Sequence, residues 1–134
     1  MKTRAESIDF FLRSEQIWPL SWKSGTNSGC FAGALREVLG RLSDDIYKTV
    51  IKQTLFILQL DHIALNIAHD KKDKHLIMVF DRVWEFNHTV VVGILVHEIA
   101  HSFGSKTNEI LADNLARKWG FSDEIDAMRK AIQL

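Results

Sequence analysis

The sequence predicts an α+β domain in which helices flank a small antiparallel sheet, and three observations support this class. Apolar residues recur at helical spacing in segments near both ends of the chain. Between these segments, residues 63–80 follow a pattern typical of strands. With 134 residues, the chain is long enough for one hydrophobic core and too short for two cores of ordinary size. We therefore expect a single domain over residues 1–134.

The N-terminal part is predicted to be helical. Apolar side chains lie at helical spacing within residues 5–17, and Pro19 would stop that helix because the residue before a proline disfavours the α conformation. Residues 21–29 are rich in glycine, serine and asparagine and are expected to form a loop. A second helix is then expected at 30–42.

The predicted sheet follows a third helix, which Ser43 would cap and which could extend as far as Leu58. Residues 63–68 alternate between apolar and other side chains, and the charged run 70–74 separates them from the apolar run 75–80. Two such runs on either side of a polar turn are typical of a β-hairpin. The sheet is therefore expected to be antiparallel.

The C-terminal part is predicted to consist of three helices. Residues 90–103 are apolar almost all round, which predicts a helix buried on most sides. Asn108 can cap a further helix at 109–119, and Gly120 would end it. Ser122 introduces a last, amphipathic helix.

Charge and composition limit the kinds of partner. Seventeen basic residues balance seventeen acidic ones, so no overall field attracts nucleic acid or anionic lipid. Cys30 is the only cysteine, which excludes an internal disulfide and suits a reducing compartment. The chain start does not resemble a signal peptide, and the longest apolar run is well short of the about 20 residues of a membrane span. We expect a cytoplasmic protein without nucleic-acid or membrane partners, and its oligomeric state stays open.

A histidine pair marks the candidate functional site. His97 and His101 are four residues apart, which on a helix places both rings on one face within reach of one ion. Glu98 follows the first histidine and would point beside the ion, where it could take a proton from water. Zinc is the expected cofactor, because in sites of this kind it lowers the pKa of bound water to about 7. The motif therefore predicts a zinc-dependent hydrolase.

A third metal ligand is expected from the following helix. A catalytic zinc takes three protein ligands and keeps one position open. Glu109 begins a helix that would return antiparallel after a short turn, which makes it the preferred third ligand. Asp113, one turn further on, could accept the free ring N–H of a metal-binding histidine. Which of these two carboxylates binds the metal stays open.

The HExxH segment 97–101, followed by Glu109-Ile110-Leu111-Ala112-Asp113, resembles the pattern of the gluzincin group of metallopeptidases. The resemblance covers residues 76–120 and implies a zincin-like domain, with a size similar to that of the minigluzincins. It also implies peptide-bond hydrolysis, with zinc held by the two histidines and Glu109 and with Glu98 as general base. The strand at 76–80 would then be the edge strand that pairs with an extended peptide or protein substrate.

Three alternatives use these residues differently. A catalytically silent module would bind zinc and a partner without cleaving it. A cysteine hydrolase would use Cys30 as nucleophile with His97 or His88 as base, whereas Cys30 could instead cap the zinc as a latency ligand. A protease with one specific protein target is the third. No motif identifies an oxyanion-stabilising residue, for which Tyr47, His75 and His88 are the candidates.

Overall fold

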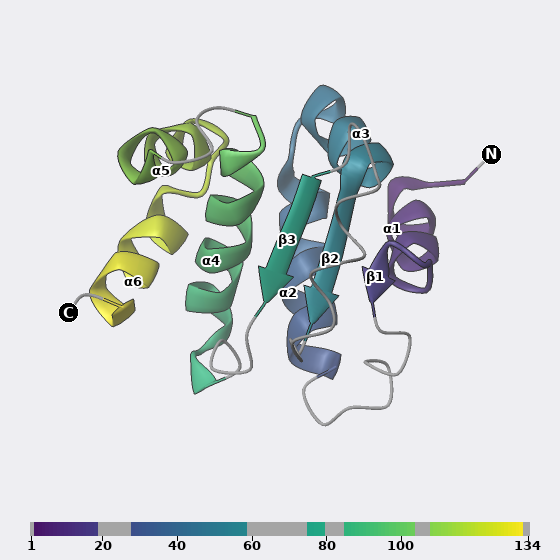
Figure 1. Ribbon diagram of the computed structural model, residues 1–134, viewed down its shortest axis with the longest axis horizontal. Helices are drawn as coiled ribbons and strands as arrows, with labels where there is room; N and C mark the ends of the chain where they lie inside the picture. The colour runs from purple at the N-terminus through teal and green to yellow at the C-terminus, as the bar shows by residue number, and fades with distance from the viewer. Residues whose placement is uncertain (1, 19–27, 59–74, 80–84, 104–107, 133–134) are drawn as a thin grey trace.

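The structure is a computed structural model that describes residues 2–18, 28–58, 75–79, 85–103 and 108–132. In these ranges helices predominate (Figure 1). The helices are α1 (Arg4–Leu12), α2 (Ser28–Arg41), α3 (Asp44–Gln53), α4 (His88–His101), α5 (Glu109–Lys118) and α6 (Ser122–Ile132). The strands are β1 (Ile17–Trp18), β2 (Thr54–Leu58) and β3 (His75–Val79).

The expected α+β class with a small antiparallel sheet is wrong. The described part of the chain is mainly helical, and its short strands run parallel in the order β1-β2-β3. β3 forms near the predicted second arm of the hairpin, but its partner is β2, with Phe56 opposite Ile77. The predicted first arm, residues 63–68, lies outside the described residues, as does the charged run that follows it.

The error has a physical cause in residues 54–58. This run combines a β-branched threonine with aromatic and aliphatic residues that favour strands. The sequence allows the third helix to extend as far as Leu58, but α3 ends at Gln53 and Thr54 already has extended backbone angles, φ −97° and ψ 134°. Parallel strands need a connection of about a dozen residues or more. The chain between β2 and β3 is therefore a crossover and not a hairpin turn.

The predicted helices are otherwise close to those of the structure, except at the N-terminus. There α1 ends at Leu12, and Ile17, expected in the same helix, lies in β1. At its start, Thr3 and Glu6 form a capping box, in which each side chain accepts from the other residue's backbone N–H. Ser43 occupies the N-cap of α3, although its side chain makes no capping hydrogen bond.

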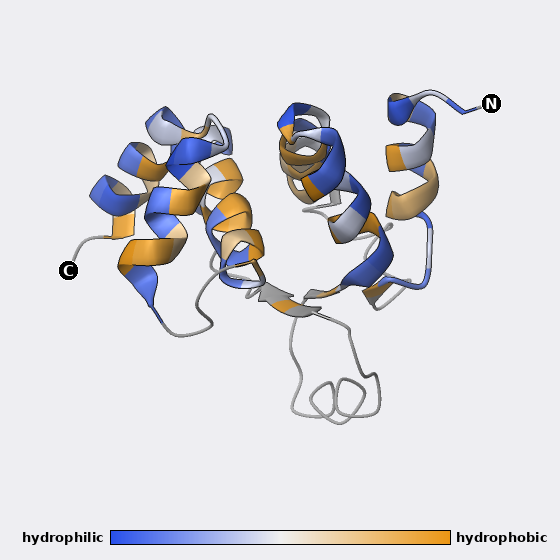
Figure 2. Ribbon diagram, turned by 90° about the horizontal axis from the view of Figure 1, so that it is seen from above, coloured by the Kyte–Doolittle hydropathy of each residue, from blue (hydrophilic) through white to orange (hydrophobic). Residues whose placement is uncertain are grey.

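The described helices all lie on one side of the sheet (Figure 2). α4 is central: it packs against α2 on one side and against α5 and α6 on the other (Figure 1). Its four valines, Leu95 and Ile99 are buried and Ile94 is partly buried, in agreement with the prediction of a helix that is covered on most sides. The core is one cluster that joins these helices to Ile17, Phe56 and Ile77 of the strands. No described helix is both long and apolar enough to span a bilayer.

One glycine sets the distance between α4 and α6. Gly93 is buried on α4, and a Cβ at this position would collide with the backbone carbonyl of Glu124 on α6. Glycine is therefore required here because the two helices cross too closely for any side chain. This close crossing brings α6 alongside the second half of α4.

Polar contacts at the rim of the core link α2 to α4 and α6. His88 Nε2 lies 2.8 Å from Glu37 Oε1, and Arg41 Nη1 lies 2.7 Å from carboxylate oxygens of both Glu37 and Glu124. The hydrogen bond with His88 is the main cause that lowers the pKa of Glu37; burial opposes it, and Arg41 adds to it. Glu37 is therefore held as a carboxylate between His88 and Arg41.

Candidate metal site

The predicted site residues lie on two neighbouring helices. His97, Glu98 and His101 belong to the last two turns of α4, and Glu109 and Asp113 to the first turns of α5. The Asn108 side chain accepts from the backbone N–H of Leu111 and so caps α5, as predicted. The structure brings all five predicted residues together, although the connecting residues 104–107 are not among those it describes.

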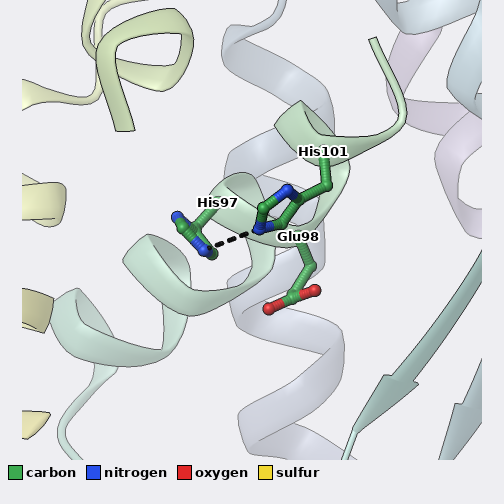
Figure 3. A group of neighbouring side chains, drawn as sticks. All are labelled: His97, Glu98 and His101. Atoms are coloured by element: carbon green, nitrogen blue, oxygen red, sulfur yellow. Dashed lines mark hydrogen bonds between the residues drawn. The ribbon is translucent and has the colours of Figure 1, made fainter. Parts of the chain in front are cut away.

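The imidazole rings of His97 and His101 meet at their Nε2 atoms. These nitrogens are 3.1 Å apart, and the rings are nearly perpendicular, at 86° (Figure 3). His97 is only 5% exposed, so its polar ring atoms depend on protein partners. The four-residue spacing therefore points both rings at one small volume, as the sequence predicts.

The carboxylate of Glu109 closes this volume from α5. Its Oε2 lies 2.7 Å from Nε2 of His97, and its Oε1 lies 3.3 Å from Nε2 of His101. Burial raises the pKa of Glu109, but the two histidines outweigh that effect and the pKa is lower than usual. An ionised carboxylate thus faces both Nε2 atoms.

The other ring nitrogen of His97, Nδ1, forms a hydrogen bond with Asp113 of α5. It donates to Oδ1 of Asp113 at 2.7 Å. Burial raises the pKa of Asp113, but hydrogen bonds from Arg129 and His97 outweigh it and hold the pKa below its usual value. Both ring nitrogens of His97 thus face carboxylates, which only accept hydrogen bonds; in the neutral ring whose proton lies on Nδ1, toward the more buried Asp113, Nε2 presents a lone pair.

Glu98 belongs to the same group but points to a different side. The ligand atoms of His97, Glu98 and His101 all lie within 4.8 Å of one another. In Figure 3 the Glu98 carboxylate extends away from the contact between the two rings. Among the described residues, no hydrogen bond or ion pair engages this partly buried carboxylate.

Other candidate residues lie in different surroundings. His88 contacts Glu37 at the start of α4, and the ring of Tyr47 lies under the guanidinium of Arg4. Cys30 is exposed on α2, and in the described ranges no histidine contacts it. The side chain of His75 lies outside the described part of the molecule. The structure thus brings neither Tyr47 nor His88 to the group around His97.

One residue that sequence reasoning missed adjoins the site. Arg129 of α6 donates to both oxygens of Asp113, from Nε at 2.6 Å and from Nη2 at 2.9 Å. A signal for it exists in the sequence, because Arg129 is four residues beyond Ile125 and next to Met128, on the apolar face of α6. A charge on such a face needs a partner.

Comparison of the chain with protein-family models, with curated proteins and with solved structures found no match. The resemblance to gluzincins therefore rests on the residues of the motif alone.

Proposed function

We propose that this chain is a zinc-dependent metallopeptidase in which His97, His101 and Glu109 bind the ion and Glu98 is the general base. The observation that carries this proposal is the convergence of two imidazole nitrogens and one carboxylate on one point. With the His97 proton on Nδ1, toward Asp113, Nε2 of His97 and the carboxylate of Glu109 are both acceptors, yet they lie 2.7 Å apart. Two acceptors at this distance repel unless a proton or a cation lies between them.

The spacing of these atoms favours a metal ion. Zinc binds nitrogen and oxygen ligands at about 2.0–2.2 Å in tetrahedral geometry, so adjacent ligand atoms are about 3.3–3.5 Å apart. The two Nε2 atoms are 3.1 Å apart and Nε2 of His101 is 3.3 Å from Oε1 of Glu109, near this spacing, whereas Nε2 of His97 and Oε2 of Glu109, at 2.7 Å, lie at hydrogen-bond distance. Three protein ligands leave a fourth position open, as catalytic zinc requires.

The geometry also distinguishes the two glutamates. Glu109 lies at ligand distance from both rings, whereas Glu98 lies within 4.8 Å of the ring nitrogens and has no partner of its own among the described residues. Within this group the Glu98 carboxylate points away from the contact between the two rings, whereas Glu109 faces both of them. We therefore assign metal binding to Glu109 and proton transfer to Glu98.

The proposed reaction follows from these roles. Zinc in such a site supplies Lewis acidity, which makes water nucleophilic near neutral pH and polarises a substrate carbonyl. Glu98 accepts the proton of the attacking water and later passes it to the leaving amine. Asp113 keeps the proton of His97 on Nδ1, so that Nε2 stays available as a ligand.

An extended peptide is the substrate class that we propose. β3 is the last strand in the order β1-β2-β3, and in Figure 1 it lies on the side of the sheet nearest α4. A strand edge of this kind can pair with an extended peptide chain through backbone hydrogen bonds. That pairing would place a peptide bond beside the helix that carries Glu98.

The test combines metal content with cleavage of a mixed peptide library. Wild type should bind one zinc per chain, His101→Ala should lose it, and His88→Ala, a histidine of the same helix outside the site, should keep it. Glu98→Gln should retain zinc and lose about 100-fold to 10,000-fold of its activity, because it cannot accept a proton. Wild type that remains free of zinc when zinc is supplied would refute the proposal.

Two other results would identify the alternatives. Zinc binding without cleavage of any peptide would favour a silent zinc-binding module, or a protease with one specific protein target. Activity that survives a chelator but is lost in Cys30→Ser would favour the cysteine hydrolase.

A further inference from the structure

Arg129 joins the proposed metal site to the last helix of the chain. Its Nε and Nη2 donate to the two oxygens of Asp113 at 2.6 and 2.9 Å, in the bidentate geometry that fits a guanidinium to a carboxylate. Nη2 also lies 3.6 Å from Oε2 of Glu109. One side chain of α6 thus reaches both acidic residues of α5 that adjoin His97.

The contacts form a chain that ends at the metal-binding nitrogen. Arg129 fixes both oxygens of Asp113, Asp113 Oδ1 accepts from Nδ1 of His97, and Nε2 of the same ring faces Glu109 and His101. The Asp113 side chain is 15% exposed and the His97 side chain 6%, so water has little access to replace these partners. Rotation of the Asp113 carboxylate would break its hydrogen bond with Nδ1 of His97.

If Arg129 served only to link α5 to α6, a contact beside His97 would not be needed. Arg117 of α5 already pairs with Asp126 of α6 at 2.7 Å and donates to Ser122. That pair is more exposed, with 66% of the Asp126 side chain accessible, and it contacts none of the proposed ligands. Among the described residues, two arginine–aspartate pairs therefore link these helices, and the Arg129 pair is the one that leads to the proposed metal site.

We propose that Arg129 is a positioning residue of the metal site: by fixing Asp113 with two hydrogen bonds, it holds His97 in the tautomer and orientation that present Nε2 to the ion. This inference rests on the proposed zinc site. Lysine cannot replace Arg129 fully, because an ammonium group lacks the planar pair of donors. We assign the effect to Asp113 and not to Glu109, because the 3.6 Å contact with Glu109 exceeds hydrogen-bond distance.

The experiment measures zinc affinity by competition with a chromophoric chelator, so it does not depend on catalysis. Arg129→Gln should bind zinc about 10-fold to 100-fold more weakly than wild type, which is the usual effect of losing an outer partner of a metal ligand. The zinc affinity of Arg129→Lys should lie between those of wild type and Arg129→Gln. The matched control, Arg117→Gln, should change the affinity by less than about twofold because it removes an α5–α6 link that is remote from the metal.

Two further measurements separate positioning from general stability. In an Asp113→Asn background, Arg129→Gln should weaken zinc binding no further, because its route to the metal is already broken. Nitrogen-15 NMR of the zinc-free protein should show the His97 proton on Nδ1 in wild type and a mixed population in Arg129→Gln. If Arg129→Gln does not fold, Arg129→Lys must still show the loss of affinity.

The outcomes are distinct for the two proposals. Zinc binding by wild type with unchanged affinity in the Arg129 variants would overturn the role of Arg129 and leave the proposed function intact. An equal loss of zinc affinity in Arg117→Gln would also overturn the role of Arg129. The loss would then follow from removing any link between α5 and α6. Absence of zinc binding in wild type would overturn both.

Discussion

Gly93→Ala tests whether the close crossing of α4 and α6 sets the stability of the molecule. A Cβ at this position meets the carbonyl oxygen and carbon of Glu124 and the Cβ of Met128. Backbone atoms cannot rotate away as a flexible side chain can, so α6 itself must move. Overpacking of this kind costs about 1–3 kcal/mol.

The expected change in melting temperature follows from the size of the chain. At about 2.1 cal/mol/K of unfolding entropy per residue, 1 kcal/mol corresponds to about 3.6 °C for 134 residues. Gly93→Ala should therefore lower Tm by about 4–11 °C in a calorimetric scan. Because Arg129 is carried by the displaced helix, zinc affinity should fall too.

Gly33→Ala is the matched control within the same core of helices. A Cβ at Gly33, in the interior of α2, meets nothing within 4 Å. Alanine there should stabilise by about 0.5–1 kcal/mol, because it restricts the unfolded chain and favours the helix. The two substitutions are thus expected to shift Tm in opposite directions. A Tm of Gly93→Ala at or above that of wild type would show that α6 does not lie where the structure places it.

Three other predictions test the site, the rim and the sheet. Zinc at 100 times its Kd should raise Tm by about 10 °C, from about 2.7 kcal/mol of binding free energy, and His101→Ala should abolish this rise in differential scanning fluorimetry. The pKa of Glu37 is lowered in the fold, so its contribution to stability is present above the unfolded value of about 4.3 and is lost as pH falls through the folded value. Glu37→Gln should therefore destabilise at pH 7 but hardly at pH 3, and urea unfolding that shows an equal loss at both would contradict this. Phe56→Ala should cost about 3–5 kcal/mol in chemical denaturation, because Phe56 is fully buried between Phe11 and Phe31; a loss under about 1 kcal/mol would argue against β2 lying in the core.

The parts of the fold that the sequence predicts well are those that local rules determine. Asn108 caps α5 through its own side chain, and the apolar run before His97 forms a helix buried on most sides, as its pattern indicates. The sheet was mispredicted because strand direction is not local. Residues 54–58 could continue a helix or form a strand, and only their pairing with residues 75–79 decides between the two.

The residues of the candidate site also differ in how far local sequence rules predict them. The spacing of His97 and His101 is a property of one helix, and Glu109 and Asp113 follow from one helix that returns against it. Arg129 comes from a third helix, and its approach depends on the crossing at Gly93, which no local pattern encodes. The sequence nevertheless contains one sign of it, a charged residue at an apolar-face position of α6.

These relations explain why the proposed site needs the whole helical group and not only the HExxH turn. α4 is apolar on most sides, so a histidine inside it is tolerated only if each ring nitrogen has a partner. For His97 those partners come from α5, and the more buried of the two, Asp113, is in turn fixed from α6. A peptide containing only residues 88–118 would keep the motif and both carboxylates but lose Arg129 and the packing of Gly93. If zinc affinity depends on the fold as we infer, such a peptide should bind the ion far more weakly than the complete chain.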